Sequence, residues 1–346
     1  PTPTATPLPT TLHIAPDGDD ARTREQAASP DTPWKTIRHA VSQSVTGDVL
    51  LVAPGDYLET GFIQTKVPGI EIRGAAPDMD EIDRSQMRIR VPAGSDVFRI
   101  RHADVLLENL WIDGGEVGIK AFGNATGLRI VDVAVTSPVQ EGIKLNKTRD
   151  VEIRGSIVTG AGKSGIWTRK AKNLLLRDLD VYANESGLYL RKGSGEAQFL
   201  TIHANQNRGV RVLNMTLTLH HSLITGHAGH AGLFEEGSAP VTLHNDLFFG
   251  NGNDINDDAT PVVVNPPDTL VFDEDPMYLD ADGPDDQLGG AGWGDDELFL
   301  QQPPAGPGLS PAVDKSTFTA VELEVTGSTE MAGAPDVGMA DFGAHR

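Results

Sequence analysis

The sequence of 346 residues contains no cysteine, so it forms no disulfide framework and uses no thiol chemistry. It also lacks any apolar run approaching the roughly 18 residues that a membrane-spanning helix needs. Basic residues are outnumbered, and the formal net charge at pH 7 is −21. Since nucleic-acid-binding proteins present a basic surface, a nucleic-acid partner is not expected.

The acidic excess is confined to one end of the chain. Residues 251–346 contain 20 acidic residues and only two basic ones, Lys315 and Arg346, which gives a formal charge of −18. The first 250 residues carry 29 acidic and 26 basic side chains, so their net charge is only −3. The acidity therefore belongs to the C-terminal end, and the rest of the chain is close to neutral.

A short pattern is repeated seven times between about Asp104 and Asp258. Each copy has an apolar strand, a polar corner, a second apolar stretch, a Gly-rich turn and then Gly followed by an aliphatic residue. The anchors are Gly118-Ile119, Gly142-Ile143, Gly165-Ile166, Gly187-Leu188, Gly209-Val210, Gly232-Leu233 and the degenerate Asp254-Ile255, spaced 22 to 24 residues apart. This period, with strand-like alternation, predicts an all-β parallel β-helix with one coil per repeat. The signature of leucine-rich repeats, which share the period, does not recur.

Four earlier apolar stretches extend the prediction to about ten coils over residues 49–260. Residues 11–48 are expected to form an N-terminal strand at 12–15 and a capping helix that opens at Pro33. Trp34, Ile37, Val41 and Val45 follow at helical spacing, and a helix of this kind can cover the apolar end of a solenoid. Residues 261–346 are expected to pack on the β-helix as an acidic tail.

Residues 1–10 contain only Pro, Thr, Ala and Leu, which is typical of an extended, solvated linker. We interpret it as a tether left after export or lipid anchoring, and thus expect a secreted or cell-surface protein. An ordinary flexible terminus is the alternative.

Polar residues mark one corner of the repeat, nine or ten positions before the glycine anchors. They are Asn109, Asp132, Gly155, Asp178 and Asn245. Asn, Asp and Gly tolerate the left-handed conformation that a sharp bend between strands requires. These residues are therefore predicted to be structural.

Two segments resemble secreted right-handed β-helix proteins of the pectate-lyase-like superfamily. Residues 29–59, SPDTPWKTIRHAVSQSVTGDVLLVAPGDYLE, look like their opening segment, and DPMYLD with the later PDVGMADFG resembles their closing segment. The resemblance implies a right-handed β-helix and an extracellular or periplasmic location. It leaves the activity open, because this superfamily includes lyases, hydrolases, epimerases and non-catalytic surface proteins.

Alternation along the strands predicts which side chains face outward after each glycine. The first outward row is Lys120, Lys144, Trp167, Tyr189, Arg211 and Phe234, and the second is Phe122, Asn146, Arg169, Arg191, Leu213 and Glu236. Cations one coil apart repel each other unless an anion lies along them. Aromatic rings beside cations suit sugar rings that carry carboxylate or sulfate. We therefore predict an anionic polysaccharide as the partner, with Lys120, Lys144, Trp167, Tyr189, Arg191 and Arg211 as binding residues. A solvated face with ordinary stacking between coils is the alternative.

The residue types on this face argue against a glycoside hydrolase. Glycoside hydrolysis needs two carboxylates about 5–9.5 Å apart, but the rows offer only Glu236, with Glu141 and Glu235 near turns. The Asp-Pro-His-Asp stretch of alginate epimerase-like proteins is absent. β-Elimination from a uronate instead needs a base and a cation that neutralises the carboxylate.

The strand Gly142-Ile143-Lys144-Leu145-Asn146-Lys147, with Arg169 downstream, is similar to the Lys and Arg arrangement of the chondroitinase B and alginate lyase family. The resemblance implies that Lys147 is the base and that Arg169 binds the leaving oxygen or the carboxylate. That family's acidic calcium ligands are replaced here by Gln140 and Gly142, so Lys144 or Arg191 would neutralise the carboxylate. The sequence therefore leaves two hypotheses open, a polysaccharide-binding protein that cleaves its ligand as a lyase and a non-catalytic surface rod for adhesion or assembly.

Residues 280–286 open like a calcium loop, with the pattern D-x-D-G. We predict structural calcium at Asp280, Asp282 and Asp285, with a plain acidic loop as the alternative. His220, His221, His227 and His230 match no zinc signature and are predicted to be polar surface residues.

Overall fold

A computed structural model describes residues 7–75, 83–257, 262–264, 270–289, 293–294, 296–302, 309–316, 318–325, 327–329, 336 and 338–345. Residues 1–6 of the predicted linker and residues 76–82 lie outside the described residues, as do the remaining positions of the predicted C-terminal tail.

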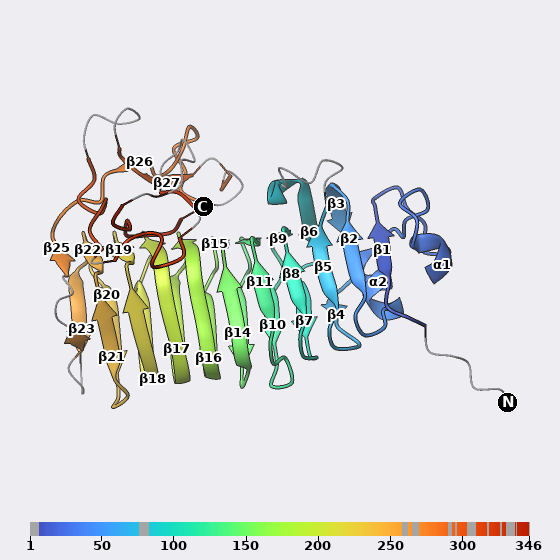
Figure 1. Ribbon diagram of the computed structural model, residues 1–346, viewed down its shortest axis with the longest axis horizontal. Coiled ribbons are helices and arrows are strands. Elements are labelled where there is room, and N and C mark those ends of the chain that lie inside the picture. Colours follow the sequence, from blue (N-terminus) through green and yellow to red (C-terminus); the bar gives the residue numbers. More distant parts are fainter. Residues whose placement is uncertain are drawn as a thin grey trace.

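The chain forms a right-handed parallel β-helix of about 9 turns, which confirms the predicted fold (Figure 1). Each full turn contributes one strand to each of three parallel layers. The Gly-Ile layer contains β4 (Ile63–Gln64), β7 (Phe98–Ile100), β10 (Ile119–Ala121), β13 (Ile143–Asn146), β20 (Ala231–Glu236), β23 (Asn253–Asp257) and the first parts of β16 (Ser164–Tyr182), β17 (Ser186–His203) and β18 (Val210–His220).

The other two layers complete each turn. The middle layer contains β1 (Thr11–Ile14), β2 (Val49–Val52), β5 (Glu71–Gly74), β8 (Leu106–Glu108), β11 (Arg129–Val131), β14 (Arg149–Arg154), β21 (Val241–His244), β24 (Val263–Val264) and later parts of β16, β17 and β18. The third layer contains β3 (Gly55–Leu58), β6 (Met87–Arg90), β9 (Trp111–Asp113), β12 (Ala134–Thr136), β15 (Ile157–Thr159), β19 (Leu223–Thr225), β22 (Leu247–Phe249), β25 (Val271–Phe272) and the ends of β16 and β17. Strands β24 and β25 show that the solenoid continues past residue 260, where the sequence predicted its end.

The core is a stack of aliphatic side chains in strict register. Along the Gly-Ile layer, Ile143 pairs with Ile166, Ile166 with Leu188, and Leu188 with Val210. All four side chains are fully buried. A slip of one residue would turn the whole stack outward, because side chains alternate between the two faces of a strand. Each side chain exposed in this way would cost roughly 1.5–3 kcal/mol.

The glycine anchors recur because successive coils approach closely at this position. A Cβ atom on Gly142 would lie 2.6 Å from the carbonyl oxygen of Gly165, and one on Gly187 would lie 2.4 Å from that of Gly209. Asp254, where the repeat departs from glycine, lies on β23, beyond which no described strand pairs. The last coil has no such close neighbour, so a side chain fits.

The predicted left-handed corner is confirmed. The φ angles are 53° at Asn109, 51° at Asp132, 57° at Gly155, 52° at Asp178 and 55° at Asn245. Two further residues share this corner on the intervening coils, Phe199 at 53° and His221 at 50°. Bulky side chains rarely adopt this conformation, and here both are buried under the C-terminal segment.

A helix packs at the N-terminal end of the solenoid, as predicted. Helix α2 (Ile37–Gln43) lies against β1, β2 and β4, with Ile37 and Val41 buried. It begins later than expected, because Trp34 is still extended and bridges Ile14, while Thr36 caps the helix. A short helix α1 (Arg24–Ala27) and a 3-10 turn η1 (Arg84–Gln86) were not predicted.

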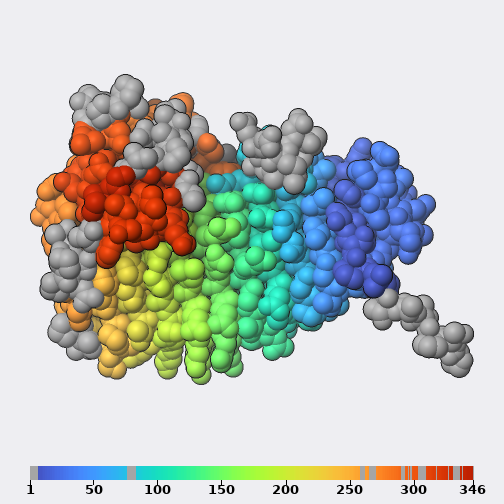
Figure 2. All heavy atoms as spheres, viewed as in Figure 1, coloured from blue at the N-terminus to red at the C-terminus, as the bar shows by residue number. Residues whose placement is uncertain are grey.

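The described part of the C-terminal segment packs on the third layer (Figures 1 and 2). Its antiparallel pair β26 (Tyr278–Asp280) and β27 (Glu297–Leu300) lies over this layer, and Tyr182 contacts Trp293 and Leu298. Among the described residues, no helix is long and apolar enough to cross a membrane.

Candidate functional site

The outward rows of the Gly-Ile layer have the register that the sequence predicted. Lys120 pairs with Lys144, Lys144 with Trp167, Trp167 with Tyr189, Tyr189 with Arg211, and Arg211 with Phe234. In the second row Asn146 pairs with Arg169, Arg169 with Arg191, Arg191 with Leu213, and Leu213 with Glu236. The predicted binding residues therefore share one surface, which we call the Gly-Ile face.

Three of the predicted cations are neutralised by the protein itself, which corrects the expectation that only a bound anion would hold the row together. Asp96 lies 3.1 Å from Lys120 and 2.7 Å from Arg99, Glu141 lies 2.9 Å from Lys144, and Glu236 lies 2.8 Å from Arg211. Asp96 and Glu141 come from the residues just before the strands, which the alternation rule had left out.

Cations also stack on the two aromatic rings in the centre of the face. Lys144 Nζ lies 5.0 Å from the centroid of Trp167. Arg211 and Arg191 lie 4.5 and 5.6 Å from the ring of Tyr189. Such contacts keep the rings and the charges side by side.

The second row ends in a series of exposed cations. Lys147, Lys170 and Lys192 occupy the same position on three successive coils, one residue after Asn146, Arg169 and Arg191. We call Lys147, Arg169, Lys170, Arg191 and Lys192 the basic ridge. None of the five forms an ion pair with another described residue, and all but the half-buried Arg191 are exposed.

The three lysines of the basic ridge have left-handed backbones, with φ angles of 60°, 58° and 53°. This conformation costs an L-residue such as Lys roughly 1–2 kcal/mol. The next two coils have Asn214 and Gly237 at this position, which are the residue types that tolerate it. Folding alone therefore does not explain three lysines there.

A pocket of about 260 Å³ opens on the other side of the aromatic rings. It is lined by Glu141, Lys163, Ser164, Trp167, Glu185, Ser186, Tyr189, Asn207, Arg208 and Arg211. Most of these residues stand one or two positions before a glycine anchor. Sequence reasoning missed them because it followed the alternation only after each glycine.

Two oxygen atoms near this pocket are buried without a hydrogen-bond partner in the described structure. They are Oε2 of Glu141 and Oδ1 of Asn207. The other carboxylate oxygen of Glu141 contacts Lys144, and the Glu141 residue is only 5% exposed. Buried acceptors of this kind are uncommon in native proteins.

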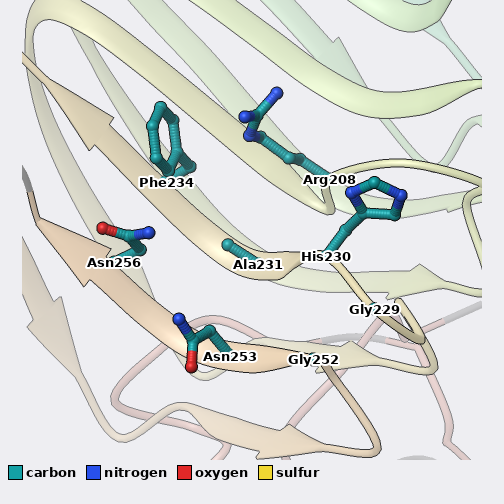
Figure 3. Close-up of a pocket in the computed structure, with 8 residues that line it drawn as sticks. All are labelled: Arg208, Gly229, His230, Ala231, Phe234, Gly252, Asn253 and Asn256. Atoms are coloured by element: carbon teal, nitrogen blue, oxygen red, sulfur yellow. The ribbon is translucent and has the colours of Figure 1, made fainter.

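A second pocket of about 200 Å³ lies beside the first, toward the last coils (Figure 3). It is lined by Arg208, Gly229, His230, Ala231, Phe234, Gly252, Asn253 and Asn256. Arg208 lines both pockets, and its guanidinium lies 4.2 Å from the ring of Phe234. We call the two pockets together the groove.

The predicted catalytic residues lie on the basic ridge and line neither pocket of the groove. The backbone N–H of Lys147 donates to the carbonyl oxygen of Arg169 over 2.7 Å, so the two residues are neighbours on adjacent coils. Both side chains are exposed. Their proposed catalytic roles stay predictions.

The predicted calcium ligands are not gathered. Asp280, Asp282 and Asp285 are exposed, and no group of three or more His, Asp or Glu among the described residues could hold a metal ion. The segment is closed by its own turns, in which the N–H of Gln287 donates to Oδ1 of Asp285. Calcium binding stays a prediction from the sequence.

Two of the predicted surface histidines are buried instead. His221 is 2% exposed and His227 is fully buried. Burial lowers the pKa of His221 to about 3 and that of His227 to about 4. Both residues point into packed layers, because they continue corner and turn positions that Asn occupies on other coils.

The fold and this face define a right-handed parallel β-helix protein. Residues 104–263 match the family model described as "Right handed beta helix region". The solved structure of pectate lyase Pel9A matches with 12% identity, a TM-score of 0.58 and coverage of 96% of both chains.

Other solved structures match over part of the chain. An alginate lyase from Paenibacillus sp. str. FPU-7 is 12% identical, with a TM-score of 0.45 and coverage of 66% of this chain and 96% of its own. The periplasmic alginate epimerase AlgG is 13% identical, with a TM-score of 0.40 and coverage of 68% and 76%. Comparison with curated protein sequences gives no match. At these identities the likeness to Pel9A confirms the expected resemblance for the fold.

Proposed function

We propose that the protein binds an anionic polysaccharide across the Gly-Ile face, as a secreted or cell-surface protein. The observation that carries this proposal is the basic ridge, five cations on three coils with no ion pair among the described residues. It runs beside Trp167 and Tyr189, whose rings sit on adjacent coils.

The geometry suits a polymer that crosses several coils. Adjacent coils are about 4.8 Å apart, so the ridge presents cations at short, regular intervals along the solenoid axis. Arginine guanidinium groups bind carboxylate or sulfate through two parallel hydrogen bonds, and lysine adds a point charge. The two rings offer flat apolar surfaces to sugar rings beside these charges.

Binding to fragments of alginate, pectate and chondroitin tests the proposal. We expect Arg169→Ala and Trp167→Ala each to weaken binding at least about 10-fold, because the first removes charge-assisted hydrogen bonds to the anion and the second removes a large apolar contact. Arg129→Ala is the matched control, since Arg129 is exposed on the middle layer. Affinity should also fall with added salt. If no fragment binds, the protein is better described as a non-catalytic surface rod.

Cleavage by β-elimination is a second candidate, supported by the adjacency of Lys147 and Arg169. In that reaction Lys147 would take the proton next to the uronate carboxylate, and a carbon–carbon double bond would form as the bond to the glycosidic oxygen breaks. The leaving oxygen would take up a proton, and Arg169 would bind the carboxylate or the leaving oxygen. Absorbance of an unsaturated uronate should then rise on incubation with a bound fragment. Lys147→Ala should abolish that rise, while Lys172→Ala, at an exposed position outside the basic ridge, should keep most of it. Binding without any rise would leave a binding protein that does not cleave.

A further inference from the structure

We infer that Glu141 and Asn207 bind free hydroxyl groups of the sugar chain, on the side of the aromatic rings opposite the basic ridge. The inference rests on the proposed function and deepens it. It assigns a chemical requirement to the ligand, namely unsubstituted hydroxyls facing the groove.

Two acceptor atoms of the pocket have no hydrogen-bond donor. Glu141 Oε2 and Asn207 Oδ1 are buried atoms with no hydrogen-bond partner in the described structure, and both residues line the same pocket. A buried acceptor left unpaired has lost its hydrogen bonds to water without gaining others. A ligand that donates hydrogen bonds to these atoms would replace the lost bonds.

The two acceptors lie on either side of the aromatic rings along the solenoid axis. Glu141 precedes β13 and Asn207 precedes β18, so they lie three coils apart, about 14 Å along the axis. The rings of Trp167 and Tyr189 lie on the two coils between them. On each coil the pocket residues and the ridge residues stand on opposite sides of the ring, roughly 10 Å or less from it along the strand.

The ridge side and the pocket side of the aromatic rings differ in their chemistry. The ridge supplies only cations, which suit carboxylate or sulfate. On the pocket side, Glu141 and Asn207 offer oxygen acceptors, and Glu185 adds an exposed carboxylate at the rim. Three cations also line this pocket, but each is engaged by the protein: Arg211 pairs with Glu236, Lys163 donates to Gln140 and Arg208 stacks on Phe234. A hydroxyl at the unpaired oxygen of Glu141 would donate to it, whereas an anionic group there would be repelled. The face therefore orients a sugar chain with its acidic groups toward the ridge and its hydroxyls toward the pocket.

The test compares ligands with and without free hydroxyls. The probe is the alginate, pectate or chondroitin fragment that binds the wild type, together with the same fragment after chemical O-acetylation. We expect O-acetylation to weaken wild-type binding by about 10- to 100-fold, since a hydrogen bond to a charged group has that effect. Glu141→Gln should weaken binding of the unmodified fragment to a similar extent. O-acetylation should then cost this variant little more.

Glu185→Gln is the matched control. It removes the same charge from the same pocket, but Glu185 is exposed. If Glu141 acted only through its charge, both variants would bind the anionic fragment equally or more tightly than the wild type, and the inference would be overturned. Asn207→Ala tests the second acceptor independently, should Glu141→Gln disturb the contact with Lys144. The inference requires weaker binding in this variant as well.

Arg169→Ala separates this inference from the proposed function. If Arg169→Ala weakens binding while Glu141→Gln and O-acetylation do not, the polysaccharide site stands and the hydroxyl requirement is wrong. If the wild type binds none of the three fragments, both are wrong.

Discussion

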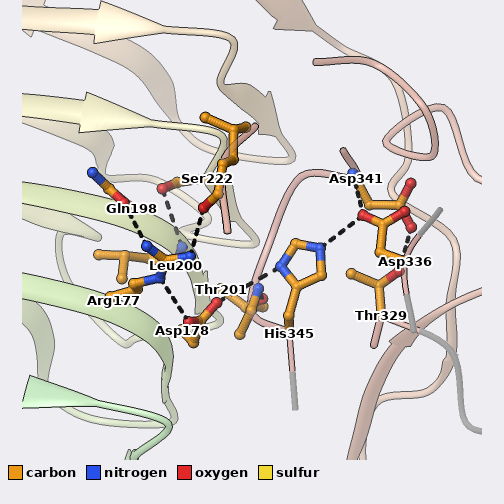
Figure 4. Close-up of polar contacts among 12 residues, drawn as sticks. Arg177, Asp178, Gln198, Leu200, Thr201, Ser222, Thr329, Asp336, Asp341 and His345 are labelled. Carbon is orange, nitrogen blue, oxygen red and sulfur yellow. Dashed lines mark hydrogen bonds and ion pairs between the residues drawn. The ribbon is translucent and has the colours of Figure 1, made fainter. Parts of the chain in front are cut away.

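His345 Nε2 lies 3.1 Å from Asp336 Oδ2, within the segment that packs on the solenoid (Figure 4). On its other side the same ring lies 3.7 Å from Asp178, a corner residue of the β-helix. The ring also packs edge-on against Phe199. One buried histidine thus joins two parts of the C-terminal segment to the solenoid.

The docking of this segment is expected to weaken above neutral pH. Burial lowers the pKa of His345, but the hydrogen bond with Asp336 and the negative charges of Asp178 and Asp336 outweigh this effect and raise the pKa above its usual value. A group with a raised pKa in the folded state contributes stability below its unfolded pKa, about 6.5, and loses it as pH rises through the folded pKa. Hydrogen exchange of residues 338–345 should therefore speed up, after correction for intrinsic rates, as the pH rises above about 6.5.

His345→Gln is the control, because glutamine keeps a hydrogen-bond donor but does not titrate in this range. The same pH dependence in this variant would show that another group is responsible. The range above pH 6.5 avoids two other groups of this contact. Burial raises the pKa of Asp341 to about 6, and His221, which hydrogen-bonds Ser316, has its pKa lowered to about 3.

A buried row of three asparagines and one histidine is expected to make the stability of the solenoid fall in acid. Asn184, Asn205, His227 and Asn251 are linked from coil to coil by side-chain hydrogen bonds. Burial is the main cause that lowers the pKa of His227 to about 4. Since this histidine must be neutral in the folded state, the protein loses stability as the pH falls from about 6.5 toward 4, by about 3 kcal/mol in total.

His227→Asn should reduce this loss, because asparagine already fills the equivalent position on the neighbouring coils. Thermal melts at pH 7 and pH 5 should show a smaller drop for the variant than for the wild type. The drop should not vanish, since His203 also has its pKa lowered to about 4 by burial. His230→Asn, at an exposed position, should leave the drop unchanged; an equal drop in both variants would contradict the assignment to His227.

The glycine anchors should resist substitution where another coil follows. In Gly187→Ala the new Cβ would lie 2.4 Å from the carbonyl oxygen of Gly209, which is backbone and cannot rotate away. Overpacking of this kind typically costs about 1–3 kcal/mol. Gly61→Ala is the control, because nothing lies within 4 Å of its Cβ position, and its effect should stay within about 0.5 kcal/mol. Chemical denaturation of the two variants measures both values; equal stabilities would show that close approach does not explain the glycines.

The register of the solenoid was predictable because these steric limits recur on every coil. Gly142 and Gly187 are needed for close approach, and Asn109 and Asn245 for the corner, so the period could be read from residue types alone. Phe199 and His221 escaped prediction because packing of the C-terminal segment overrides the local preference of that corner.

The site was predictable only in part, for a related reason. Trp167, Tyr189 and Arg169 follow strict strand alternation, so their place on the Gly-Ile face could be predicted. Glu141 and Arg208 precede the strands, where the chain turns and alternation does not hold, so their place in the groove depends on the three-dimensional path of the turns. The ion pairs that neutralise Lys120 and Lys144 come from these same turns.

The lysines of the basic ridge should oppose stability and favour binding. Lys170 has a φ of 58°, and Asn214 fills the equivalent position two coils further on without the same cost, because its short polar side chain tolerates this conformation. Lys170→Asn is therefore expected to raise the free energy of unfolding by about 0.5–1 kcal/mol. The same change removes a cation from the ridge, so affinity for an anionic polysaccharide fragment should fall several-fold.

Lys172→Asn separates the two effects. Lys172 is exposed on the same strand but is not in the left-handed conformation, so losing its charge should bring no gain in stability. Denaturant unfolding together with fragment binding at low salt measures both quantities for each variant. Lys170→Asn alone should gain stability and lose affinity. That result would mean that asparagine stabilises the fold more than lysine at this position, and that lysine contributes to ligand binding instead. Loss of stability in Lys170→Asn would instead show that lysine packs favourably at this bend, and the argument from backbone conformation would fail.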